Sequence, residues 1–169
     1  MQLYQIYTRL GQQESANAIL EKVISHYPYI SQTLMEKGNN ELAANQYQQA
    51  YTTYQSLLAN EANAFLALYN LGCLSMLRGD YFQAPNFFES ATGMNEDYLP
   101  AQINHALSLL AVDRETEAQP LLQELDSEFP NNDAIQRARA LERFLAGYSD
   151  VAIQFLEKTN ENEEKDASA

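Results

Sequence analysis

The sequence contains few of the residues on which catalysis and cross-linking depend. Its 169 residues include a single cysteine, Cys73, so no disulfide bond can form within the chain. The two histidines, His26 and His105, have no metal-type spacing to carboxylates or to the cysteine. No glycine-rich phosphate-binding loop is present, and the acidic residues are scattered along the chain. We therefore expect a protein that is not an enzyme and that carries no metal or other cofactor.

Basic residues are also scarce, because 10 Lys and Arg stand against 23 Asp and Glu, which gives a net charge of −13. Such a surface repels nucleic acid and anionic membranes, which bind clusters of Lys and Arg, so we expect neither as a partner. No segment approaches the ~20 apolar residues of a membrane span, so direct membrane insertion is not expected. The first residues lack the basic region and apolar core of a signal peptide. We place the chain in the cytoplasm, with the periplasm as the alternative if it is a fragment of a longer protein.

What the sequence does have is a strict internal period. Alanine recurs every 34 residues, at Ala16, Ala50, Ala84, Ala118 and Ala152. A fixed period of about 20 to 50 residues is typical of a solenoid built from stacked supersecondary units. Because a single unit cannot bury its apolar face, neighbouring units are expected to stack against one another.

Three other positions keep the same register. With each of these alanines counted as position 20 of its unit, position 8 is small, position 15 is Gly, Asn or Asp, and position 24 is large. Small residues at positions 8 and 20 allow two helices to approach closely, and the large residue at position 24 fills the space beside them. Position 15 can end the first helix, because Gly, Asn and Asp tolerate a positive φ. These residues are Gly38, Gly72, Ala106 and Ala140 at position 8, Gly11, Asn45, Gly79, Asp113 and Gly147 at position 15, and Leu20, Tyr54, Phe88, Leu122 and Leu156 at position 24.

This pattern resembles the tetratricopeptide repeat family. The best match is Leu68-Tyr-Asn-Leu-Gly72, followed by Gly79-Asp-Tyr-Phe-Gln-Ala84 and Phe88, which is similar to the family's W-x-x-L-G, G-x-Y-x-x-A and F consensus with Leu68 in place of Trp. The resemblance covers residues 1 to about 158 and implies an all-α fold, a right-handed α-solenoid of about five stacked helix–turn–helix units. Repeats 1 to 5 are 1–30 (partial), 31–64, 65–98, 99–132 and 133–160, and we expect 160–169 to be an acidic disordered tail.

Two features depart from the family pattern. Pro85 and Pro120 fall at positions 21 and 22, past the first turn of a second helix, where proline removes a backbone hydrogen bond. We expect these two helices to start late or to bend. The first helix of repeat 1 is short, and its face carries Leu3, Tyr4, Ile6, Tyr7 and Leu10. Either the chain is a fragment of a longer array, or this face packs against another molecule, such as a second copy in a homodimer.

The resemblance also implies where a partner would bind, because the first helices of this family line a concave groove with positions 2, 5, 6, 9, 12 and 13. Asn70 and Asn104 occupy position 6, where asparagines of the family often hydrogen-bond the main chain of an extended peptide. The alternative is that both make ordinary helix–helix hydrogen bonds. The predicted groove residues are Met35, Asn39, Leu66, Tyr69, Asn70, Cys73, Met76, Ile103, Asn104, Leu107 and Leu110, and repeat 5 offers Arg137, Leu141, Phe144 and Leu145 at the same positions.

The sequence thus predicts a non-enzymatic protein–protein interaction scaffold. It would bind a peptide or a helix of a partner protein in an apolar concave groove, in the assembly of a bacterial protein complex. One alternative is a secretion-system chaperone that holds an apolar export substrate, since the chain resembles the small acidic repeat chaperones in motif, length and charge. The other alternative is a self-associating structural segment of a longer repeat protein.

Overall fold

The computed structural model describes residues 6, 7, 9–12, 15, 18, 19, 22, 23, 29–58 and 61–153. The regular secondary structure of these residues is helical throughout, in agreement with the expected all-α fold. The chain divides into two compact parts, an N-terminal unit, Met1–Glu96, and a C-terminal unit, Asp97–Ala169. The predicted tail at 160–169 lies outside the described residues.

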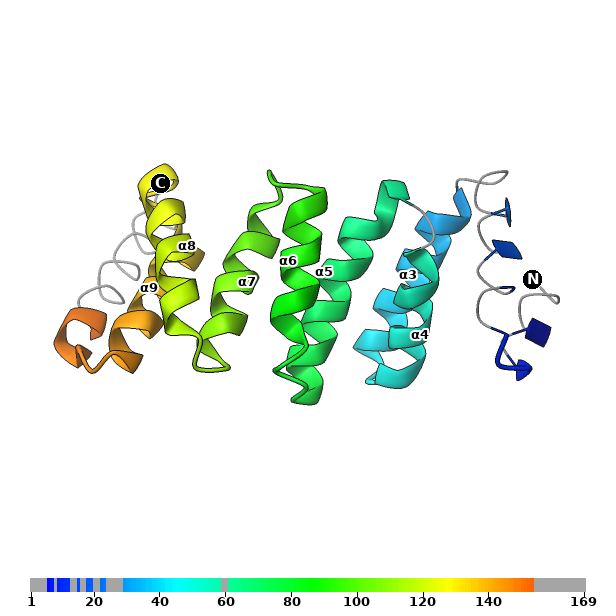
Figure 1. Cartoon of the computed structure of the whole chain (residues 1–169), viewed down its shortest axis with the longest axis horizontal. Helices are drawn as coiled ribbons and strands as arrows, with labels where there is room; N and C mark the ends of the chain where they lie inside the picture. Colours follow the sequence, from blue (N-terminus) through cyan, green and yellow to red (C-terminus); the bar gives the residue numbers. More distant parts are fainter. Residues whose placement is uncertain are drawn as a thin grey trace, which may run out of the picture. The chain divides into compact units, whose positions relative to one another are not determined.

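The N-terminal unit contains two complete helix pairs that follow each other in the chain. Its helices are α3 (Tyr29–Ala43), α4 (Tyr47–Leu57), α5 (Glu61–Arg78) and α6 (Ala84–Met94). Helix α3 packs against α4, α5 packs against α6, and α4 also packs against α5 (Figure 1). Each pair is a helix–turn–helix. Helix α3 begins two residues before the predicted start of repeat 2 at residue 31, and α5 begins four residues before the predicted start of repeat 3 at residue 65.

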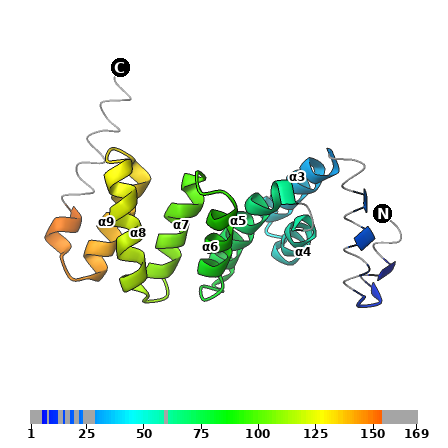
Figure 2. The ribbon, with the colours of Figure 1, turned by 45° about the horizontal axis from the view of Figure 1, so that its top comes forward.

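The C-terminal unit repeats this arrangement. Its helices are α7 (Leu99–Leu110), α8 (Glu115–Glu128) and α9 (Asp133–Leu145), and residues 149–153 are also helical. Helix α7 packs against α8, and α9 packs against both of them (Figure 2). Asn132 begins α9 by accepting hydrogen bonds from the backbone N–H groups of Ala134 and Ile135, which would otherwise lack partners at the helix end.

The turn inside every repeat has the same backbone geometry. Asn45 donates its N–H to the carbonyl of Leu42 (2.9 Å), and Gln46 donates to the carbonyl of Glu41 (2.8 Å), which is the Schellman pattern of hydrogen bonds. The pattern requires a positive φ at position 15, and the predicted residues all have one. The φ values are 71° at Gly11, 58° at Asn45, 77° at Gly79, 60° at Asp113 and 86° at Gly147. The prediction that position 15 ends the first helix is confirmed.

Close approach within a repeat depends on the pairing of positions 8 and 24. A β-carbon added to Gly38 would lie 2.5 Å from the Tyr54 ring, and one added to Gly72 would lie 2.6 Å from the Phe88 ring. Both distances are too short for a carbon–carbon contact, so only glycine fits beneath these rings. The position-20 alanines Ala50, Ala84, Ala118 and Ala152 are buried as well. The packing predicted for positions 8, 20 and 24 is confirmed for these residues.

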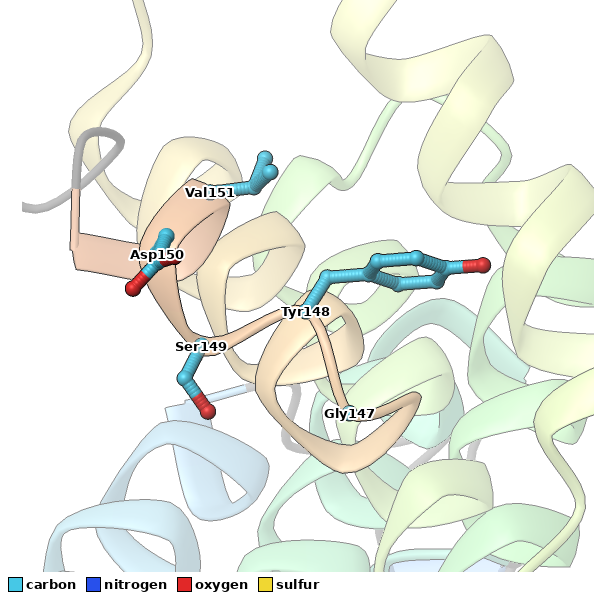
Figure 3. A pocket seen from close by; sticks show the side chains of 5 residues that line it. All are labelled: Gly147, Tyr148, Ser149, Asp150 and Val151. Atoms are coloured by element: carbon cyan, nitrogen blue, oxygen red, sulfur yellow. The ribbon is translucent and has the colours of Figure 1, made fainter.

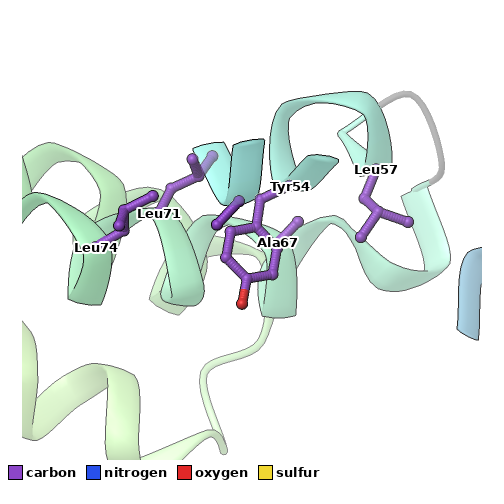
Figure 4. Close-up of a cluster of buried hydrophobic side chains, with 6 residues drawn as sticks. Tyr54, Leu57, Ala67, Leu71 and Leu74 are labelled. Atoms are coloured by element: carbon purple, nitrogen blue, oxygen red, sulfur yellow. The ribbon is translucent and has the colours of Figure 1, made fainter. Parts of the chain in front are cut away.

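Stacking of one repeat on the next is carried by a buried apolar cluster between α4 and α5. Figure 4 shows Tyr54 and Leu57 of α4 beside Ala67, Leu71 and Leu74 of α5, and all five side chains are fully buried. Apolar burial of this kind is the main force that holds neighbouring repeats together.

The two prolines in second helices behave differently. Helix α6 begins at Ala84, so Pro85 lies in its first turn, where the missing N–H has no intrahelical partner to lose. The expected late start is confirmed there. Helix α8 begins at Glu115 and continues through Pro120, so a late start is wrong for that helix. Both Pro120 and Thr116, whose carbonyl loses its partner, are exposed, so that water can satisfy the carbonyl.

A polar residue at position 7 of repeat 2 joins α3 to α4. Lys37 Nζ donates to Glu41 Oε1 (2.5 Å) and to Thr53 Oγ1 (2.9 Å), while Thr53 Oγ1 donates to Glu41 Oε2 (2.7 Å). Burial disfavours the ionised carboxylate, but the hydrogen bonds from Lys37 and Thr53 and the charge of Lys37 outweigh it and lower the pKa of Glu41. This triad replaces the apolar contact that leucine would make at position 7.

Candidate functional site

The first helices of repeats 2 and 3 lie next to each other in the N-terminal unit. Asn70 Nδ2 of α5 contacts Met35 Sδ of α3 at 3.2 Å, and both side chains are half-buried. A thioether is a weak acceptor, and this contact uses only the Nδ2 group of the Asn70 amide. The amide oxygen of Asn70 does not interact with Met35. Two predicted groove residues are therefore brought together from different repeats.

Helix α5 presents the remaining predicted residues of this unit along one face. Leu66, Tyr69, Cys73 and Met76 are all half-buried, so each keeps part of its side chain in contact with solvent. The Tyr69 ring lies 5.9 Å from the buried Phe88 ring at an interplanar angle of 59°, a tilted arrangement that is favourable for two aromatic rings. Phe88 thus fixes the orientation of Tyr69 on the surface.

Asn39 has a structural partner that the sequence did not indicate. Its Oδ1 accepts a hydrogen bond from the Tyr54 hydroxyl at 2.7 Å, although the Asn39 side chain is exposed. Burial of the Tyr54 ring, followed by the negative charges of Cys73 and Glu41, raises the pKa of Tyr54 to about 12. Asn39 therefore provides the acceptor for the hydroxyl of a core tyrosine in repeat 2. Only the part of its amide that does not face Tyr54 is available to a ligand.

This raised pKa predicts a specific loss of stability in alkali. Because neutral Tyr54 is favoured in the folded state, its contribution is fully present below pH 10 and is lost as the pH rises through about 12. We expect the urea midpoint of the wild type to fall more steeply between pH 10 and 11.5 than that of Tyr54→Phe. At pH 8 the variant should be less stable by about 1 kcal/mol, the value of the lost hydrogen bond. Equal alkaline slopes for the two proteins would contradict the prediction.

In the C-terminal unit the predicted groove residues separate into two groups. Asn104 and Leu107 of α7 are half-buried, whereas Ile103 and Leu110 are only 7% and 2% exposed. Ile103 belongs to a cluster with Ile135 of α9, and Leu110 belongs to one with Ala138 of α9. Positions 5 and 12 of this repeat are covered by the next first helix, so Ile103 and Leu110 are core residues and have almost no surface to offer a partner.

Comparisons with known proteins agree with this geometry. A family model described as a tetratricopeptide repeat matches residues 5–28, which form most of repeat 1. The fold is similar to the crystal structure of MamA, with a TM-score of 0.69 and 20% identity over 100% of this chain and 99% of that one. The chain therefore has a fold like that of tetratricopeptide repeat proteins. A search of the curated proteins finds no relative by sequence.

A second tetratricopeptide repeat structure of similar fold is that of YrrB, described as having an unusual peptide-binding site. It has a TM-score of 0.64 and 16% identity over 92% of this chain and 80% of that one. At such identities the likeness establishes the fold of the present repeat protein and leaves its partner open.

The C-terminal unit carries an apolar hollow of about 380 Å³. Leu141 and Phe144 of α9, which the repeat register assigned to the groove, line it together with Ile153. Their side chains are 41%, 59% and 53% exposed. Ile153 was not predicted, because only first helices were considered; its occurrence at position 21 is the signal that indicates it. Arg137, Ala140, Ser149 and Ala152 complete the lining.

A neighbouring hollow of about 250 Å³ is formed by the turn at Gly147–Val151 (Figure 3). The side chains of Tyr148, Ser149 and Val151 point in different directions from this turn, so they do not converge on a common point. Among the described residues, no group of three or more His, Cys, Asp or Glu side chains could hold a metal ion. Within the same part of the chain, no helix is both long enough and apolar enough to cross a bilayer.

Proposed function

We propose that this repeat protein is a non-enzymatic scaffold that binds a peptide or a helix of a partner protein along the inner faces of its first helices. The observation that carries the proposal is the face of α5 next to α3. There Leu66, Tyr69, Cys73 and Met76 stay partly exposed, although the apolar residues on the opposite side of the same helix are fully buried. Partly exposed apolar surface beside a rigid core is typical of protein-binding sites.

The chemistry of this face favours an apolar segment of the partner. Tyr69 is held by Phe88 and therefore loses little side-chain entropy on binding, while Met35 and Met76 can adapt to different side chains. Asn70 would hydrogen-bond the main chain of the segment. Because the chain has a net charge of −13, basic residues flanking the segment would speed association. Assembly of a bacterial protein complex and retention of an apolar export substrate are both uses of such a face.

Peptide selection tests the proposal without knowledge of the natural partner. A displayed random library of peptides is selected against the whole protein, and the dissociation constants of the enriched peptides are measured by fluorescence anisotropy. We expect Tyr69→Ser or Met76→Ser to weaken the binding of these peptides by at least ~10-fold, since an aromatic or large apolar anchor is lost. The selected sequences should be rich in apolar residues.

Phe82→Ser is the matched control. Phe82 is 83% exposed in the turn between α5 and α6 and is not one of the predicted groove residues, so its replacement removes apolar surface without changing the proposed site. Circular dichroism checks that every variant remains folded. Peptides that tolerate changes at Tyr69 and Met76 but are lost with Phe82→Ser would place binding on another surface. A failure to enrich any peptide would also contradict the proposal.

A further inference from the structure

Glu36 is an exposed carboxylate on the side of α3 that faces away from α4. Gly38 marks the side that faces α4, because a β-carbon added there would lie against the Tyr54 ring. Each residue turns an α-helix by about 100°, so Glu36 points about 200° away from Gly38. Its neighbour Met35 contacts Asn70 of α5 at 3.2 Å. Glu36 therefore belongs to the inner face of the N-terminal unit, at the edge next to α5.

The negative charge of Glu36 is not compensated by a cation. Glu36 Oε1 accepts a hydrogen bond from Gln32 Nε2 at 3.2 Å, and an amide carries no charge. The adjacent Lys37 is engaged elsewhere, since its Nζ donates to Glu41 and Thr53. No Lys or Arg in the described part of the chain forms an ion pair with Glu36. Its Oε2 and its charge are therefore available to a binding partner.

The face of α5 next to Glu36 is apolar. Helix α5 has no charged residue between Glu61 and Arg78, its first and last residues. Large apolar side chains such as Tyr69 and Met76 are partly exposed on this helix. A carboxylate at the edge of apolar surface is less screened than one surrounded by water, so it discriminates more strongly between a cation and an anion. The N-terminal unit thus offers an apolar contact and an uncompensated negative charge on one face.

We propose that Glu36 makes this face selective for a segment that carries a lysine or an arginine close to its apolar residues. The selectivity rests on the proposed peptide-binding function and adds the chemistry of one residue of the partner. Packed helices lie about 8–10 Å apart, and an extended segment advances about 3.3 Å per residue. The basic residue of the segment should therefore lie about three residues from the apolar residue that contacts Tyr69. Gln32 positions the Glu36 carboxylate through its hydrogen bond.

Parallel peptide selections against two forms of the whole protein test this selectivity. The wild type should enrich peptides with Lys or Arg about three residues from a large apolar residue, and Glu36→Lys should enrich Asp or Glu there. In fluorescence anisotropy, Glu36→Lys should weaken a peptide selected on the wild type by about 10-fold. Exchange of the basic residue of that peptide for glutamate should restore its binding to the variant. Both effects should shrink in about 0.5 M salt, which screens exposed ion pairs.

Glu89→Lys is the matched control, because it changes the net charge by the same amount. Glu89 is exposed on α6, the second helix of repeat 3, so it lies outside the inner faces of the first helices. We expect Glu89→Lys to enrich the same peptides as the wild type and to weaken their binding by less than about 2-fold. Equal losses in Glu36→Lys and Glu89→Lys would assign the effect to the net charge and overturn the role of Glu36.

Two further outcomes separate the role of Glu36 from the proposed function itself. Peptides that depend on Tyr69 but show no preference for Lys or Arg would overturn the selectivity and leave the scaffold function in place. A failure to enrich any peptide would contradict both. Glu36 is exposed and its hydrogen bond goes to Gln32 in the preceding turn of the same helix, so circular dichroism should show that Glu36→Lys stays folded.

Discussion

Replacing Gly72 with alanine is expected to destabilise the N-terminal unit by about 2 kcal/mol, although alanine is the better helix former. The added β-carbon would lie 2.6 Å from the Phe88 ring, which is only 1% exposed and would have to shift within the core. The measurement is urea unfolding followed by circular dichroism. Gly93→Ala is the matched control: it also lies in a helix of the N-terminal unit but has no atom within 4 Å of an added β-carbon, so it should be neutral or stabilising.

The chain itself contains the compensating change. In repeat 4 the same two positions are Ala106 and Leu122, which share a buried cluster. Introducing this pair into repeat 3, as Gly72→Ala with Phe88→Leu, should restore most of the stability, because the smaller side chain leaves room for the methyl group. We expect a favourable coupling energy of at least about 1.5 kcal/mol between the two changes. Strictly additive effects would show that Gly72 and Phe88 do not constrain each other.

Removal of the Arg139 side chain should cost about 3–5 kcal/mol, the largest effect that we predict for a single change. Arg139 Nη1 donates to Glu142 Oε2 at 2.5 Å, and the two side chains are only 9% and 7% exposed. In Arg139→Ala the Glu142 carboxylate would remain buried without its partner. Arg137→Ala, an exposed position on the same helix, should change the stability by less than about 0.5 kcal/mol in the same urea titration.

The same pair should nevertheless be replaceable by apolar residues. Arg139 Nε lies 3.7 Å from Asp126 Oδ2 and is a buried donor without a hydrogen-bond partner. The interactions of the Arg139 guanidinium therefore do not fully compensate for the free energy that its removal from water costs. Arg139 and Glu142 occupy positions 7 and 10, where repeat 3 has Leu71 and Leu74. The double change to leucine at both sites should recover the loss or exceed the stability of the wild type. A double variant as unstable as Arg139→Ala would show that the ion pair is needed for folding.

Position-by-position comparison of the repeats explains which predictions could be made from the sequence. Position 15 requires a positive φ, and few residue types accept one, so Asn45 and Asp113 could be recognised among glycines. Positions 8, 20 and 24 contact each other inside one repeat, so their partners lie at fixed separations in the chain. The neighbours of these residues were therefore predictable, and the helix pairs that follow from them were predicted correctly.

Positions at the surface between repeats could not be assigned from the sequence in the same way as positions that contact each other within one repeat. Position 5 is half-buried Met35 in repeat 2 and buried Ile103 in repeat 4, and Phe144 at position 12 is open where Leu110 is covered. Whether such a residue is core or binding surface depends on the helix placed over it, which belongs to the next repeat. The hydrogen bond between Tyr54 and Asn39 lies within repeat 2, but it was not predicted because the repeat consensus does not specify it.

The sequence alone thus determined the period, the turn at position 15 and the pairing of helices, because all of these arise from contacts within 34 residues of one another. Only the tertiary structure decided which apolar faces are covered and which stay open. Burial is a property of two surfaces in contact, and the second surface is supplied by whichever helix stacks next.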